Sequence, residues 1–174
     1  LNLLAGGRPG VAEPGEAFVT AVAAGDRLVL GTSEGRLVAV SHVDGRVVWQ
    51  TRAGDEGARR LMAGEDFVVA SFPEGTAVRV SAVRTEDGSA VWSRVFADVA
   101  RMPQNATLSP DGVLLMTTPG QVLAKDLFEA GSQLTFETPV DVGTPFTGMV
   151  EPGHLTVWEG VLLAATDQGQ FVRG

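Results

Sequence analysis

The stretches AVSHVDGRVVW (residues 39–49) and AVRTEDGSAVW (residues 82–92) share one pattern, and this pattern decides the fold. Each begins with an alanine and ends with a tryptophan four residues after a glycine. The second stretch begins 43 residues after the first, and Gly131 follows Gly88 by the same interval. A period of about 40–45 residues is typical of the blades of a β-propeller. The sequence therefore predicts an all-β propeller built of four-stranded antiparallel blades.

A second repeated pattern marks a hairpin in each blade. GDRLVLGTSEG (residues 25–35) consists of an acidic turn, an apolar strand and a second turn that closes on glycine. The same order of features recurs in EDFVVASFPEG, PDGVLLMTTPG and EGVLLAATDQG, at residues 65–75, 110–120 and 159–169. Tight turns between strands often need a residue with positive φ, which glycine adopts without strain. We expect the closing glycines to fill this role: Gly35, Gly75, Gly120 and Gly169.

Together the two patterns divide residues 17–174 into four blades. The approximate bounds of the blades are residues 17–53, 57–97, 98–140 and 144–174. We expect the last blade to lack a fourth strand. Helices are expected to be short at most, and residues 55–60 and 97–102 are compatible with one turn each.

The N-terminal segment, residues 1–16, begins with the apolar stretch Leu1–Leu4. In propellers a strand from one terminus often pairs with strands from the other, which protects the sheet edges. Residues 1–4 could therefore close a ring of four blades. The alternative is a piece of a larger propeller, whose open edges are covered by another chain or by further sequence. Because the chain begins with Leu rather than Met, we expect a processed or excised piece.

Composition and charge argue against several classes of function. The net charge is −8, and no basic stripe is available for the phosphates of nucleic acid or for an anionic membrane. The chain has no cysteine, so it has no disulfide framework and no thiolate metal site. No apolar run reaches the roughly 18 residues that a bilayer span needs, so we expect no direct membrane insertion.

The pattern around Trp49 resembles the tryptophan-docking repeat of the quinoprotein (PQQ-like) β-propellers. That repeat usually reads A-x-D-x-x-T-G-x-x-x-W, and both stretches carry its alanine, glycine and tryptophan. The resemblance implies a structural role for Trp49 and Trp92. Each indole would lie flat between neighbouring blades, against the turn of its own repeat, which contains Gly45 or Gly88. An indole suits this role because it buries a large apolar area and brings one N–H for a backbone carbonyl.

The match to the repeat is incomplete. Ser41 and Arg84 replace the aspartate of the family pattern. Asp44 and Asp87 replace its threonine. In the third repeat Thr135 stands where the tryptophan belongs. The resemblance therefore concerns the fold rather than an activity.

Members of this family are of two kinds. Quinoprotein dehydrogenases hold PQQ and calcium at the propeller axis and use an aspartate base. Others are scaffolds without a cofactor, such as the lipoprotein of the outer-membrane β-barrel assembly machinery. We expect the second kind: no catalytic activity, no cofactor, no metal, and protein partners in a membrane-associated assembly of the periplasm, extracellular space or ER lumen. Two alternatives are a fragment of a PQQ-dependent oxidoreductase and the lumenal propeller of an ER-membrane insertase large subunit.

No residue pattern points to catalysis or metal binding. His42 and His154 are the only histidines, and neither has a second ligand at metal-binding spacing. Acidic pairs such as Asp55-Glu56 fall at expected turns, and no G-x-S-x-G motif is present. A third alternative, a substrate-binding propeller of the lactonase kind, rests on SPDG at residues 109–112 alone. Asn105 begins a glycosylation sequon, which matters only in a eukaryotic lumenal protein.

The candidate partner-binding residues lie in the expected connections between blades. Such loops occupy equivalent places in successive blades and therefore share one rim of a propeller. Arginine and methionine are enriched at protein interfaces, although arginine stems also cover apolar edges. We predict a partner-binding rim formed by Arg59, Arg60, Met62, Arg101 and Met102.

Overall fold

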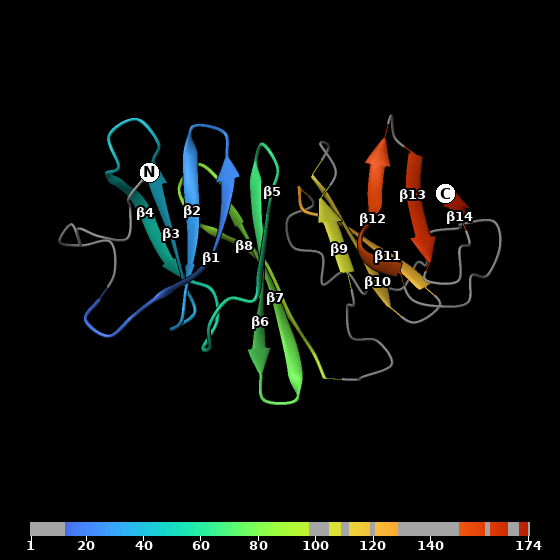
Figure 1. Cartoon of the computed structure of the whole chain (residues 1–174), viewed down its shortest axis with the longest axis horizontal. Coiled ribbons are helices and arrows are strands. Elements are labelled where there is room, and N and C mark those ends of the chain that lie inside the picture. The colour runs from blue at the N-terminus through green and yellow to red at the C-terminus, as the bar shows by residue number, and fades with distance from the viewer. Residues whose placement is uncertain are drawn as a thin grey trace. The chain divides into compact units, whose positions relative to one another are not determined.

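The computed structural model describes residues 13–97, 105–108, 112–118, 121–128, 150–158, 161–166 and 171–173. All regular elements in these ranges are β-strands, and they form two four-stranded and two three-stranded sheets (Figure 1). The all-β prediction is therefore confirmed. The chain divides into two compact units, Leu1–Val95 and Phe96–Gly174. Among the described residues, no helix is long and apolar enough to cross a membrane.

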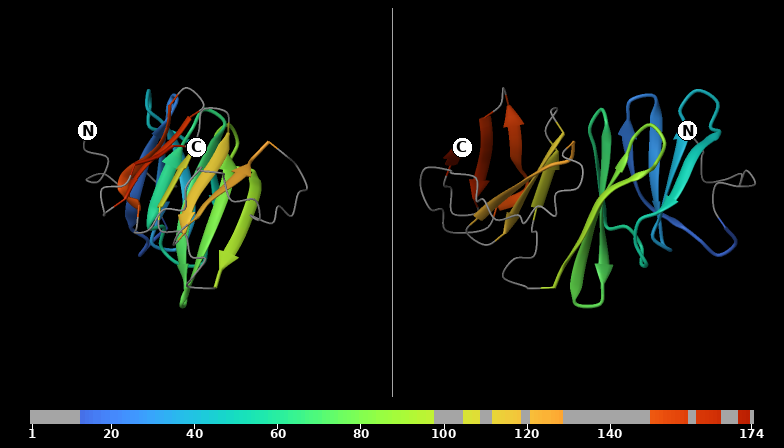
Figure 2. Two further views of the ribbon diagram at one scale, coloured as in Figure 1. Left: turned by 90° about the vertical axis from the view of Figure 1, so that its right-hand side faces the viewer. Right: turned by 180° about the vertical axis from the view of Figure 1, so that it is seen from behind.

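The first unit contains the two four-stranded sheets. In both, the strands lie in the order in which they follow along the chain, and each pairs antiparallel with the next. The first strands of the two sheets lie side by side (Figure 2). The first sheet consists of β1 (Phe18–Ala24), β2 (Arg27–Thr32), β3 (Arg36–Ser41) and β4 (Val47–Arg52). The second consists of β5 (Arg60–Ala63), β6 (Phe67–Glu74), β7 (Ala77–Arg84) and β8 (Ala90–Phe96).

The connection between these sheets differs from the prediction. No helical turn forms at residues 55–60, and Arg60 and Met62 belong to a strand, β5, instead of a loop. The strand is held by its pairing with β6, in which Arg60 lies opposite Ser71. Arg59 extends the ladder, because its N–H donates to the carbonyl oxygen of Ser71 at 2.8 Å. A four-residue strand gives too few alternations to be recognised from its sequence.

The core of the first unit lies between its two sheets. Val29 and Leu37 of the first sheet share a buried cluster with Val68 and Phe72 of the second. The other face of the first sheet is also apolar, and a second cluster there contains Leu30, Val38 and Val40. Both sets of alternating residues are therefore buried, as is typical of strands covered on two faces.

The second unit contains the two three-stranded sheets. One has the order β11-β10-β9 and the other the order β12-β13-β14. The strands are β9 (Asn105–Leu108), β10 (Val113–Thr118), β11 (Gln121–Asp126), β12 (Val150–Trp158), β13 (Val161–Thr166) and β14 (Phe171–Arg173). Asn105 lies in β9, opposite Thr117 of β10, and its glycosylation stays a prediction. Several predictions concern residues outside the described ranges: Leu1–Leu4, Arg101, Met102, Gly120, Gly131 and Gly169.

One backbone hydrogen bond recurs in three repeats. The N–H of Thr85, just after β7, donates to the carbonyl oxygen of Asp66 at 2.8 Å. The equivalent bonds join His42 to Asp26 at 3.2 Å and Leu127 to Gly112 at 3.1 Å. The third repeat therefore keeps this hydrogen bond, although its sequence lacks the tryptophan of the first two.

Gly35 and Gly75 both have the positive φ that their turns predict, but their surroundings differ. Their φ angles are 79° and 59°. The carbonyl oxygen of Gly35 accepts hydrogen bonds from the N–H groups of Ala53 and Gly54, both at 3.0 Å. A Cβ at Gly35 would lie only 2.2 Å from the carbonyl oxygen of Gly54, whereas one at Gly75 would meet nothing within 4 Å.

We expect Gly35→Ala to lower the free energy of unfolding by roughly 3 kcal/mol, because the added Cβ collides with backbone. Gly75→Ala has the same left-handed strain without a collision and should cost about 1 kcal/mol. Urea denaturation of the two variants measures the difference. Equal costs would contradict the close approach of the Gly35 and Gly54 segments.

Candidate functional site

Trp49 joins the two blades of the first unit through its indole N–H. The residue lies on β4 and is only 7% exposed. Its Nε1 donates to the carbonyl oxygen of Thr85, which follows β7 of the second sheet, at 2.8 Å. The guanidinium of Arg27, at the start of β2, donates to the same oxygen. One carbonyl of the second blade thus accepts two hydrogen bonds from the first.

The indole ring packs on Gly88, in the turn between β7 and β8. A Cβ at Gly88 would lie 2.6 Å from Cε3 of Trp49, and the φ of this glycine is 72°. The resemblance implied that Trp49 packs against the turn of its own repeat, which contains Gly45. That prediction was wrong, because Trp49 points from its own sheet toward the following one and meets the next repeat's turn.

The aspartates that replace the threonine of the family pattern hold the β3–β4 and β7–β8 turns. Oδ1 of Asp44 accepts a hydrogen bond from the N–H of Arg46 at 3.1 Å, and Oδ1 of Asp87 accepts one from the N–H of Ser89 at 2.8 Å. The N–H of Arg46 lowers the pKa of Asp44, and the hydroxyl and N–H of Ser89 lower the pKa of Asp87. These carboxylates therefore stay ionised and support turns.

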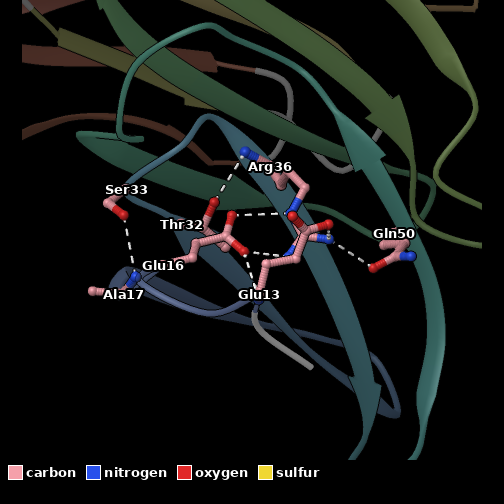
Figure 3. A network of polar contacts seen from close by, with 7 residues as sticks. All are labelled: Glu13, Glu16, Ala17, Thr32, Ser33, Arg36 and Gln50. Carbon is pink, nitrogen blue, oxygen red and sulfur yellow. Dashed lines mark hydrogen bonds and ion pairs between the residues drawn. The ribbon is translucent and has the colours of Figure 1, made fainter. Parts of the chain in front are cut away.

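A polar network fastens the segment before β1 to the first sheet (Figure 3). Arg36, at the start of β3, forms a two-point ion pair with Glu16, in which Nε lies 2.9 Å from Oε1. Nη1 of Arg36 also donates to Oε1 of Gln50 on β4 at 2.9 Å. The N–H of Arg36 donates to Oγ1 of Thr32 at 3.1 Å. This network could not be predicted from the sequence, because its members are polar residues of the types that are common on any protein surface.

The ion pair changes the acidity of Glu16. The hydrogen bonds from Arg36 lower the pKa of Glu16 from 4.5 to about 2, against the opposing effect of burial. The side chain of Glu16 is 3% exposed, so solvent screens the pair little. A depressed carboxyl pKa stabilises the fold above the unfolded-state pKa, and this stabilisation is lost as the pH falls toward the folded-state value.

An open groove of about 350 Å³ lies between the end of β4 and strands β7 and β8. Its polar groups come from both blades of the first unit. Oγ of Ser81 donates to the carbonyl oxygen of Ala53 at 2.8 Å and lies 2.9 Å from Oγ of Ser93. The residues that line the groove include Arg52 from the first blade, Asp55 from the connection between the blades, and Arg79, Ser81, Trp92 and Ser93 from the second blade.

The residues predicted to bind a partner do not line this groove. Arg59 and Arg60 are exposed and Met62 is half-buried, along the start of β5. The groove's own arginines, Arg52 and Arg79, gave no signal in the sequence, because both occur within strand-like stretches. Arg52 and Arg79 line one groove only because of the way in which the two sheets pack.

The described residues contain no group of three or more His, Cys, Asp or Glu side chains that could hold a metal ion. His42 belongs to a turn, where its Nδ1 lies 2.7 Å from the carbonyl oxygen of Asp26 and must donate to it. His154 lies on β12.

A family model described as the outer membrane protein assembly factor BamB matches residues 8–173. This chain belongs to that family. The predicted membership of the PQQ-like repeat propellers is therefore confirmed. A search of curated proteins found no match to this chain.

Solved structures confirm the propeller fold. The chain is 20% identical to BamB from Moraxella catarrhalis, with a TM-score of 0.55 over 86% of this chain and 46% of that one. It is 14% identical to the Swd1 propeller domain from Myceliophteria thermophila, with a TM-score of 0.59 over 91% and 50% of the two chains. The computationally designed Ika4 protein is 14% identical, with a TM-score of 0.62 over 91% and 90%. The chain thus spans about half the length of the two natural propellers.

We expect a thermodynamic coupling between Gly88 and Trp49. Gly88→Ala should cost about 3 kcal/mol in the natural sequence, where Cβ meets the ring, but only about 1 kcal/mol in a Trp49→Leu background, where backbone strain remains. Gly25→Ala is the matched control, because Gly25 has a φ of 58° and open space around it. Its cost should be the same in both backgrounds when measured by urea denaturation. A cost of Gly88→Ala that is unchanged by Trp49→Leu would contradict the contact.

We also expect a pH-dependent contribution from Glu16. At pH 7, Glu16→Gln should lower the free energy of unfolding by about 2 kcal/mol, because one partner of a charge-assisted pair is lost. The difference should shrink as the pH falls from about 5 to about 2, since the natural carboxylate is then protonated. Urea denaturation across this range tests it, with Glu34→Gln at an exposed position as the control. A difference independent of pH would show that the charge of Glu16 contributes nothing.

Proposed function

We propose that the chain is a non-catalytic scaffold for protein–protein interaction in an extracytoplasmic, membrane-associated assembly. The observation that carries the proposal is the match of residues 8–173 to a family described by an outer-membrane assembly factor. BamB, by its name, takes part in the assembly of outer membrane proteins. The partners proposed for this chain are proteins.

The outer strands of the first unit supply a surface that suits this role. β4 and β8 are the last strands of their sheets, so among the described residues one side of each has no neighbouring strand in its sheet. Such an edge can pair with an extended segment of another chain through main-chain hydrogen bonds. Val43, Val47 and Val48, in and after the turn that leads into β4, are 81%, 37% and 45% exposed. Exposed apolar residues beside an open edge favour docking of a partner.

Site-specific photo-crosslinking in cells of the source organism tests the proposal. A benzophenone amino acid at Val47 or Val48 should crosslink to one recurrent protein. The same amino acid at Glu34, an exposed position in the β2–β3 turn away from the open edge, should give much less of that product. Absence of a recurrent protein product from every exposed position on the chain would contradict the scaffold role.

The rival function, a PQQ-dependent oxidoreductase, predicts a different result in vitro. We expect no saturable change in the absorbance of PQQ when the purified chain is added in the presence of calcium. A stoichiometric spectral change, abolished by removal of calcium, would favour the oxidoreductase and overturn the scaffold proposal.

A further inference from the structure

The groove between β4 and strands β7 and β8 carries guanidinium groups that are only partly used. Arg52 pairs through Nε with Asp55 at 3.7 Å, and Arg79 pairs through Nε with Glu74 at 2.7 Å. An arginine side chain has five N–H donors, and four of them lie on the two Nη atoms. Each arginine therefore keeps most of its planar donor fork for another acceptor.

The two ion pairs differ in strength, but neither prevents a further contact. Arg52 and Asp55 are 59% and 75% exposed, and a long pair of this kind contributes little free energy. Arg79 is 28% exposed, and its Nε lies 2.7 Å from Oε2 of Glu74. The planar guanidinium fork is pre-organised, and carboxylates bind such forks with two parallel hydrogen bonds.

The two serines that line the groove leave a hydrogen-bond acceptor at Ser93. The carbonyl oxygen of Ala53 can only accept, so the hydroxyl of Ser81 donates to it. The hydrogen bond between the two serines must then run from Ser93 to Ser81, because the proton of Ser81 is already committed. Oγ of Ser93 is left with lone pairs that can accept from a bound N–H. Ser93 lies on β8, beside the open edge of its sheet.

We propose that this groove binds an extended segment of a partner protein that carries an acidic side chain. The carboxylate is held by the forks of Arg52 and Arg79, while a main-chain N–H of the segment donates to Oγ of Ser93. The side chain of Trp92, which also lines the groove, supplies an apolar flank. The inference rests on the proposed scaffold function and names the chemistry of the partner.

Selection of a random octapeptide library displayed on phage is the probe. The enriched peptides should contain Asp or Glu at one recurrent position. Fluorescence anisotropy of an enriched peptide should show a loss of affinity of about tenfold or more for both Arg52→Gln and Arg79→Gln. Replacing the peptide's acidic residue with its amide should cause a similar loss.

Arg46→Gln is the matched control, because Arg46 is 83% exposed and pairs with Asp44 in the β3–β4 turn, outside the lining of the groove. Its affinity should stay within about twofold of the natural chain. Thermal melts show whether Arg79→Gln folds, and the exposed Arg52 provides an independent variant if it does not. Failure to enrich peptides, enrichment without acidic residues, or affinity unchanged in Arg52→Gln would each overturn the proposal. If photo-crosslinks at the β4 edge persist in that case, the scaffold function stands without this groove.

Discussion

The carbonyl oxygen of Thr85 fixes how one blade of the first unit meets the next. A buried carbonyl must be paired, and here Trp49 and Arg27 of the preceding blade both donate to it. The N–H of the same residue donates to Asp66 within its own blade. The peptide groups on both sides of Thr85 are therefore held, so the blade interface has one register.

Glycines make this interface close enough for the contacts to form. Gly54 and Gly88 lie where a Cβ would collide with the other blade, against the ring of Phe72 and the ring of Trp49. Gly35 lies where a Cβ would collide with the backbone of Gly54, at the end of its own blade. Gly35 and Gly88 therefore provide space as well as the positive φ of their turns. In contrast, Gly25 and Gly75 have open surroundings and serve the turn alone.

The sequence predicts those parts of the fold that recur. The interval between Trp49 and Trp92 predicted the blades, and the burial of Trp49 with a hydrogen bond to a carbonyl followed from the chemistry of indole. The identity of that carbonyl did not follow, because it depends on how two sheets pack. Contacts that form in only one blade could not be predicted from the sequence for the same reason. Glu16 and Arg36 are twenty residues apart in unlike elements, and no periodicity connects them.

The surfaces that we propose for partner binding are those that do not take part in the packing of the blades. Apolar faces and glycine turns form the blade interface, whereas the groove with Arg52 and Arg79 and the outer strands are the surfaces that we propose for a partner. Such a division lets the surface vary while the repeat stays constant, which is consistent with the many functions that propellers support.

The packing of Trp49 on the turn of the following repeat is tested most directly by nuclear Overhauser effects in solution. Irradiation of the indole protons of Trp49 should give strong effects to the Hα protons of Gly88, and ring currents should shift these protons upfield. The indole N–H should also exchange slowly with solvent, because Thr85 accepts it in a buried position. Effects to Gly45 in place of Gly88, with rapid exchange of the indole proton, would contradict this arrangement of the blades.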